Sequence, residues 1–201
     1  MVDNIIFSPR ANLRFNPTQN INLRLSYSSG FRAPQAFDED MHIENVGGTV
    51  AMIERAKDLK EEKSQSFSAS ADMYHRFGAF QTNLLIEGFY TRLTDVFVLG
   101  EPYDRGDGIL VKTRSNGPGA KVMGLTLEGK VAYLSILQIQ AGLTLQRSRY
   151  DEPHKWHDDA PAEKKIFRTP DTYGYFTATC TPIKPLSIAL SGTCLLYTSP
   201  S

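Results

Sequence analysis

Two clusters of potential metal ligands stand out in the sequence, and each lies in a polar stretch. The first is a His-x-x-His-Asp-Asp run, whose imidazole and carboxylate groups are ligand types that zinc accepts. It consists of His154, His157, Asp158 and Asp159. The second offers the carboxylate oxygens that Ca²⁺ prefers, and it consists of Asp38, Glu39, Asp40, His42 and Glu44. A solvated surface loop is the simpler interpretation of both clusters, so we predict no metal site and no cofactor.

The rest of the chain offers no set of nucleophile, base and orienting group, and we therefore predict that it is not an enzyme. Lys and Arg together number 22, and Asp and Glu together also number 22. This balance lacks the basic excess typical of nucleic-acid binding, so no nucleic-acid partner is expected. Cys180 and Cys194 do not have the spacing of a zinc or redox motif.

Loops of this kind must be held by other elements, and the sequence predicts β-strands for that task. In 137–146, apolar residues occupy every second position from Leu137 to Leu145, and polar residues occupy most positions between them. The same period of two runs through 20–28, 125–133 and 186–191. A helix would distribute these apolar residues around its axis, because its period is 3.6. The pattern therefore indicates an all-β fold.

The lengths of the joints between strands indicate an up-and-down sheet. Short joints, most of which contain Pro, Gly or Asn, alternate along the chain with long polar joints at 31–61, 100–108 and 151–167. Transmembrane β-barrels show this asymmetry, with short periplasmic turns and longer extracellular loops. We predict an antiparallel up-and-down transmembrane β-barrel, of which the chain supplies about eight strands of a larger barrel. The expected strands are 5–16, 19–30, 62–77, 80–99, 109–133, 136–150, 167–181 and 185–192.

In such a barrel the apolar side of each strand contacts lipid and the polar side lines a wet lumen. Mean hydropathy is −0.31, as expected when only every second residue of a strand faces lipid. Aromatic residues near strand ends are predicted to form girdles at the membrane surfaces: Tyr27, Phe77, Phe80, Tyr90, Tyr133, Tyr150, Phe167 and Tyr173. Two irregularities remain, since 80–99 has no clean apolar side and 116–119 interrupts a strand as a bulge would.

Several ordered motifs resemble one known family. They include Gly30-Phe31-Arg32-Ala33-Pro34 after a strand, Glu62-Lys63-Ser64 opening the next one, and Phe89-Tyr90 followed by Asp95-Val96. Asn116-Gly117 followed by Gly124-Leu125-Thr126-Leu127-Glu128 is a further match, although Thr126 replaces the usual acidic residue. Together these motifs resemble the barrel domain of TonB-dependent outer-membrane receptors, in the style of Bacteroides-like bacteria.

The resemblance implies a domain organisation. The family has a barrel of about 22 strands closed by an N-terminal plug, and a short box ahead of the plug binds the periplasmic protein TonB. Residues 1–192 are expected to be part of the barrel domain in the outer membrane, with plug, box and signal peptide absent from this sequence. Residues 193–201 are predicted to be a non-native tail.

The resemblance also implies a function, namely TonB-energised uptake of a scarce nutrient such as a siderophore, haem, cobalamin or an oligosaccharide. Loop residues of this family grip the ligand, and the corresponding candidates are Arg32, Tyr103, His154, Trp156 and His157. For Arg32, bracing of neighbouring carboxylates is the alternative role. Expected partners are TonB, the nutrient and outer-membrane lipid. The rival interpretations are a passive porin-like or adhesin barrel and a soluble β-rich carbohydrate-binding protein.

Overall fold

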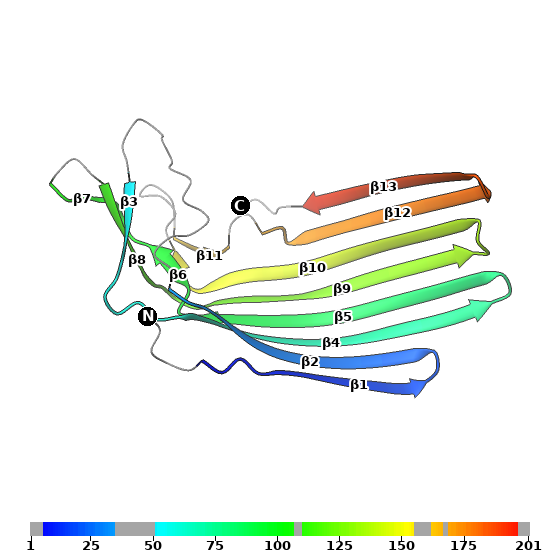
Figure 1. Ribbon diagram of the computed structural model, residues 1–201, viewed down its shortest axis with the longest axis horizontal. Coiled ribbons are helices and arrows are strands. Elements are labelled where there is room, and N and C mark those ends of the chain that lie inside the picture. The colour runs from blue at the N-terminus through cyan, green and yellow to red at the C-terminus, as the bar shows by residue number, and fades with distance from the viewer. Residues whose placement is uncertain (1–5, 35–50, 107–109, 155–161, 167–168, 197–201) are drawn as a thin grey trace.

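The computed structural model describes residues 6–34, 51–106, 110–154, 162–166 and 169–196, and all regular elements in these ranges are β-strands (Figure 1). No helix within these ranges has the length and hydropathy that would let it cross a membrane. The strands form two sheets, a large antiparallel one and a small mixed one. The larger sheet contains the strands that the period of two predicts.

The main sheet contains eight strands in the order β1-β2-β4-β5-β9-β10-β12-β13, each antiparallel to its neighbours, and β11 adds to β10 at one end. Their bounds are β1 Arg10–Thr18, β2 Ile21–Arg32, β4 Glu62–Phe77, β5 Phe80–Thr94, β9 Ala120–Tyr133, β10 Leu137–His154, β11 Glu163–Lys165, β12 Thr172–Ile183 and β13 Leu186–Leu196. The predicted eight antiparallel strands in up-and-down order are confirmed.

The hairpin turns all lie at one end of this sheet, on the right in Figure 1. They join β1 to β2, β4 to β5, β9 to β10 and β12 to β13, and none has more than three residues. Gly78 and Leu134 adopt positive φ values of 59° and 49° in two of these turns. The strand ends that the longer connections join all lie at the opposite end, so the two edges differ as they do in a transmembrane barrel.

A small sheet stands at the long-loop end, and part of it lies in the predicted loops 31–61 and 100–108. It contains β3 (Ala51–Arg55), β6 (Phe97–Leu99), β7 (Tyr103–Asp104) and β8 (Leu110–Asn116), with β3 parallel to β8. Val111 of β8 is fully buried there. The predicted single strands 80–99 and 109–133 are therefore wrong in extent. Asp95 has a φ of 55° and ends β5, and the break at 117–119 separates two strands of different sheets rather than forming a bulge.

Other strand boundaries also differ from the predicted ones. β1 begins at Arg10 rather than near residue 5, and β12 begins at Thr172 rather than 167. β13 continues to Leu196, four residues beyond the predicted end, with Cys194 opposite Gly174. Whether residues 193–201 are a native segment stays a prediction.

The register sorts the side chains of the main sheet onto two faces. The apolar face carries rows such as Leu25, Ile86, Leu127 and Leu143, and Ile86, Leu127 and Leu143 lie directly opposite one another on β5, β9 and β10. The polar face carries Asn22, Thr144 and Ser148, which are only 4–6% exposed, whereas Leu25 and Leu190 are 55% and 63% exposed. A water-soluble protein shows the opposite distribution. The exposed apolar rows therefore argue against the soluble carbohydrate-binding protein.

Aromatic residues border the apolar face at both ends. At the turn end, the rings of Phe77 and Phe80 are 5.4 Å apart and those of Phe80 and Tyr133 are 4.8 Å apart. At the loop end, the ring of Tyr27 lies 4.8 Å from that of Phe67, with Tyr90 next in register.

The distance between these aromatic rows can be compared with a bilayer. Phe67 and Phe77 are ten residues apart on β4, which is about 33 Å along a strand. At a barrel tilt of about 40° this span covers about 25 Å of membrane. The two rows therefore occupy the positions of membrane girdles. Tyr150 and Tyr173 fall on the polar face and do not belong to them, because their register partners are Ala120 and Thr144.

Candidate functional site

The Gly30–Pro34 motif ends β2 at the loop end of the main sheet. Gly30 lies opposite Ser64, and a Cβ at Gly30 would lie 2.9 Å from the Ser64 hydroxyl oxygen, so the two strands meet closely here. Arg32 lies opposite Glu62, and its guanidinium carbon is 5.7 Å from the centre of the Phe97 ring, within cation–π range. The motif therefore joins β2 and β4 to β6 of the small sheet.

Glu62 strengthens the same junction. Its Oε2 accepts a hydrogen bond of 3.1 Å from the backbone N–H of Phe97. The preceding carboxylate, Glu61, lies 3.1 Å from the ammonium of Lys63. Backbone hydrogen bonding and the hydrogen bond from Lys63 lower the pKa of the Glu61 carboxyl. Arg32 thus stands in a structural junction, and its predicted contact with a ligand stays a prediction.

Asn116 fastens two connections at this end of the sheet. Its Nδ2 donates to the backbone oxygens of Lys60 at 3.0 Å and Asp95 at 2.8 Å, and its Oδ1 accepts from the Lys60 N–H at 2.7 Å. The next residue, Gly117, has no room for a side chain, since a Cβ would lie 2.5 Å from a methyl carbon of Val98. In the sequence Asn116-Gly117 is visible only as a motif. In the structure Asn116 holds two connections in place, and Gly117 lets the chain pass close to Val98.

We expect Asn116→Ala to loosen the 56–61 connection in the full-length receptor. The change removes three hydrogen bonds to backbone groups and costs about 2 kcal/mol of local stability. Trypsin cleavage at Lys57 or Lys60 should become faster. Asn12→Ala, on the exposed strand β1, is the control and should leave the cleavage rate unchanged. Equal rates for both variants would contradict this role.

Of the other predicted ligand contacts, Tyr103 and His154 lie at the same end of the molecule. Tyr103 belongs to β7, opposite Val111, and its side chain is 46% exposed. His154 is the last residue of β10, opposite Glu163. Trp156 and His157 lie outside the described residues, as do Asp158, Asp159 and the 38–44 acidic cluster. Within the described ranges, no group of three or more His, Cys, Asp or Glu side chains is placed to hold a metal ion.

The polar face of the main sheet carries hydrogen-bonded networks. The Tyr175 hydroxyl donates to the Glu128 carboxylate at 2.5 Å, and Gln140 Nε2 donates to Glu128 at 2.8 Å and to the Tyr175 hydroxyl oxygen at 2.9 Å. These three residues come from β12, β9 and β10 and tie the strands together.

Glycines make room for aromatic rings on this face. A Cβ at Gly142 would lie 2.5 Å from the Tyr175 ring, and one at Gly124 would lie 2.5 Å from the Phe89 ring. Each ring therefore covers a glycine on a neighbouring strand. This packing explains why the sequence of 80–94 has no clean apolar side. Phe89 occupies the polar face, where its neighbours are glycine and polar residues.

A second network lies at the same level on the other side of β5, since Asp72 and Glu128 both lie opposite Leu85. The Asp72 carboxylate accepts hydrogen bonds from the Tyr74 hydroxyl at 2.7 Å and from the Asn83 amide. On the adjacent strand β2, Arg24 Nε donates a hydrogen bond of 3.0 Å to Oδ1 of Asn22 on the same strand. The polar face thus offers a hydrogen-bonding wall, as the interior side of a transmembrane barrel does.

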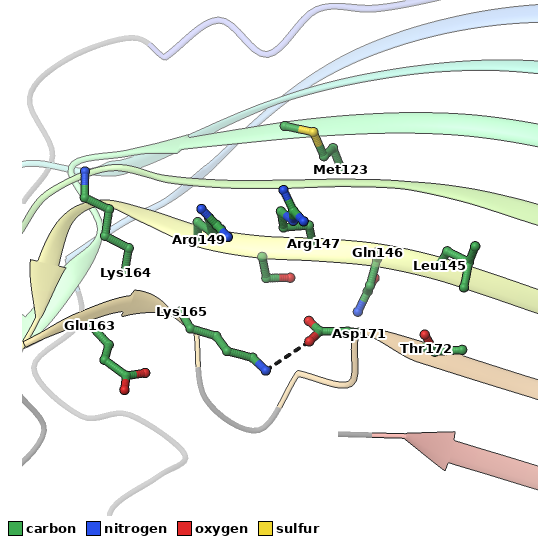
Figure 2. Close-up of a pocket in the computed structure, with 11 residues that line it drawn as sticks. Met123, Leu145, Gln146, Arg147, Arg149, Glu163, Lys164, Lys165, Asp171 and Thr172 are labelled. Carbon is green, nitrogen blue, oxygen red and sulfur yellow. Dashed lines mark ion pairs between the residues drawn. The ribbon is translucent and has the colours of Figure 1, made fainter. Parts of the chain in front are cut away.

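A hollow of about 770 Å³ opens at the loop end, where β10 exchanges its partner β12 for β11 (Figure 2). Basic residues surround it, and Lys165 forms a 2.9 Å ion pair with Asp171 across the opening. The lining consists of Met123, Leu145, Gln146, Arg147, Ser148, Arg149, Glu163, Lys164, Lys165, Asp171 and Thr172. This hollow was not predicted from the sequence, because its lining residues come from β9, β10, β11 and the start of β12.

Comparison with solved structures shows the fold. The FrpB iron transporter from Neisseria meningitidis matches with a TM-score of 0.63 and 17% identity over 92% of this chain and 26% of that one. The siderophore receptor PirA from Pseudomonas aeruginosa matches with a TM-score of 0.63 and 17% identity, covering 92% and 33%. For the alcaligin outer membrane receptor FauA from Bordetella pertussis the values are 0.57, 17%, 96% and 30%. The chain therefore spans about a third or less of these proteins.

The family of the chain is identified from its sequence. No curated protein matches it significantly. The family model described as TonB dependent receptor-like, beta-barrel matches residues 4–181, which is most of the chain. This match confirms the predicted family and the outer-membrane location that the family implies. The more specific resemblance to Bacteroides-like receptors stays a prediction. This chain belongs to the β-barrel domain family of TonB-dependent receptors and resides in the bacterial outer membrane.

Proposed function

We propose that the chain forms part of the wall of a receptor that imports a scarce nutrient with energy delivered by TonB. A ferric siderophore is the first candidate for the nutrient, and haem, cobalamin and oligosaccharides are the others. The observation that carries this proposal is the polar face, where the Glu128–Gln140–Tyr175 network faces the lumen behind an exposed apolar wall. The iron and siderophore functions in the descriptions of FrpB, PirA and FauA support the choice of nutrient.

In this proposal the chain performs no bond chemistry. The nutrient binds outside the cell at the loop end, where Arg32, Tyr103, His154, Trp156 and His157 are the proposed contacts. TonB then acts on a plug domain, and the nutrient passes along the polar face. The small sheet of β3, β6, β7 and β8 gives this rim a fixed framework, because β8 pairs with all three of its other strands.

The test is uptake by the full-length receptor in a Gram-negative host that lacks its own siderophore receptors. We expect at least one of a panel of ⁵⁵Fe-labelled siderophores to accumulate, and accumulation to stop in a matched host without TonB. Accumulation that does not depend on TonB would overturn the proposal in favour of a passive porin-like barrel. If haem, cobalamin or an oligosaccharide accumulates in a TonB-dependent manner and no siderophore does, the transport proposal stands and the choice of nutrient is wrong.

A further inference from the structure

The loop end of the apolar face carries a row of basic side chains. Arg92 of β5, Lys121 of β9, Arg149 of β10 and Lys165 of β11 are successive partners in the register. One level nearer the turns, Arg147 lies opposite Met123 on the same face. We call these five residues the basic row, and we propose that it binds the phosphate groups of a lipid in the outer leaflet.

The register establishes that the basic row faces lipid and not the lumen. On β10 the pairing with β9 runs without a shift from Leu137 to Tyr150, so Leu143, Leu145, Arg147 and Arg149 point to the same side. The row therefore begins where the exposed leucines end. In a membrane this level is the boundary between hydrocarbon and headgroups, because Tyr90 of the loop-end girdle lies two residues from Arg92.

The basic row holds more positive charge than its neighbours neutralise. Asp151 serves two cations, with its carboxylate 3.1 Å from Arg92 and 3.7 Å from Lys121. Lys165 pairs with Asp171. Arg147 and Arg149 are exposed and have no ion pair or hydrogen bond to any described residue. Like charges on directly opposite residues destabilise a sheet, so a bound anion would remove a cost that the apoprotein carries.

The other end of the apolar face has no such charge. Phe77, Phe80 and Tyr133 border it at the hairpin turns, and in the described strands of the main sheet no Lys or Arg points outward at that level. Arg76 lies near that end but alternates onto the polar face, opposite Gln81. The cations thus gather at one membrane surface, and the long connections identify it as the outer one.

An apolar groove continues from the basic row toward the middle of the membrane. The groove extends across β1, β2, β4, β5 and β9 and has a volume of about 960 Å³. Its lining is almost wholly apolar. Ala69 and Gly88 form its floor, between the larger side chains of Leu25, Phe67 and Leu125. Met123 lines both this groove and the hollow beside Arg147 and Arg149. A phosphate group and an acyl chain of one molecule would therefore find adjoining surfaces.

The combination fits a phosphorylated, acylated lipid better than free phosphate. Arginine guanidinium groups bind phosphate oxygens in a bidentate manner, and the groove would shield the attached hydrocarbon. Free phosphate would use the cations and leave the groove empty. This inference rests on the membership of the barrel family and does not depend on which nutrient is imported.

The test compares two double variants of the full-length receptor in phosphatidylcholine nanodiscs that contain bisphosphorylated lipid A. Arg147→Gln with Arg149→Gln removes the two unpaired cations of the basic row. Arg14→Gln with Arg76→Gln removes two arginines from the polar face and is the matched control. We expect the first variant to retain about tenfold less lipid A than the unmodified receptor, measured by native mass spectrometry, because charge-assisted hydrogen bonds are lost. The control should retain the normal amount.

Three results would overturn the inference. The first is equal retention by all three proteins, and the second is equal binding of dephosphorylated lipid A by the unmodified receptor. The third is release of the lipid by millimolar inorganic phosphate, which would show that only a phosphate site exists. Heat-modifiable mobility in gels verifies that each variant is folded. ⁵⁵Fe-siderophore uptake by the same variants is scored separately, so failure of this inference and failure of the proposed function are distinguishable.

Discussion

Replacement of Leu127 by Arg is expected to cost about 2–4 kcal/mol of folding free energy in a bilayer. Leu127 is 45% exposed on the apolar face, and it lies between Met123 and Tyr133, close to the middle of the membrane. An arginine there would place its charge in hydrocarbon. The measurement is the fraction of full-length receptor that folds into lipid vesicles over a urea series, seen as the heat-modifiable band.

The adjacent residue provides the control for this variant. Thr126 points to the polar face, where its hydroxyl lies 3.0 Å from that of Thr144. Thr126→Arg loses this hydrogen bond but keeps its charge in the lumen, so its cost should stay near 1 kcal/mol. If the two variants lost equal stability, the assignment of the two faces would be wrong.

Gly142→Val should destabilise the barrel by about 1–3 kcal/mol through overpacking. Its Cβ would lie 2.5 Å from the Tyr175 ring, and displacement of the ring would break the hydrogen bonds from Tyr175 to Glu128 and from Gln140 to Tyr175. The midpoint of urea unfolding in vesicles measures the loss.

Gly129→Val tests whether the effect of Gly142→Val comes from the ring. Gly129 lies on the apolar face, and nothing lies within 4 Å of a Cβ placed there. Valine favours strands, so this variant should match or slightly exceed the unmodified stability. A similar loss in both variants would point to a general intolerance of β-branched residues, and the ring packing would then carry no special weight.

The strands of the main sheet were predictable because their signal is local. A period of two and short turns determine each hairpin without knowledge of distant residues. The small sheet was not predictable in this way. Its β3 and β8 pair in parallel across more than fifty residues of chain, and the end of β5 depends on the positive φ of Asp95 and on Asn116, which binds the Asp95 carbonyl from another strand.

The site was predictable to a smaller extent for the same reason. The Arg32 motif was visible as a motif, but its position over Phe97 depends on a strand more than sixty residues away. Tyr150 and Tyr173 were placed in the girdles from their closeness to strand ends, although alternation puts them on the polar face. The basic row was within reach of the sequence, since alternation from Leu143 and Leu145 continues directly to Arg147 and Arg149.

The spacing of the two aromatic rows bears on which bilayer this wall can occupy without strain. Its apolar band covers about 25 Å, whereas an average hydrocarbon core is about 30 Å thick. Around this wall a bilayer of average thickness would have to compress by about 5 Å, at a fraction of a kcal/mol for each ångström of mismatch. The bacterial outer membrane is thinner than average. The two boundaries between its hydrocarbon and its headgroups therefore lie close to Phe67 and Phe77, with little compression of the bilayer. The positions of a few aromatic rings thus help to determine the membrane in which the receptor rests.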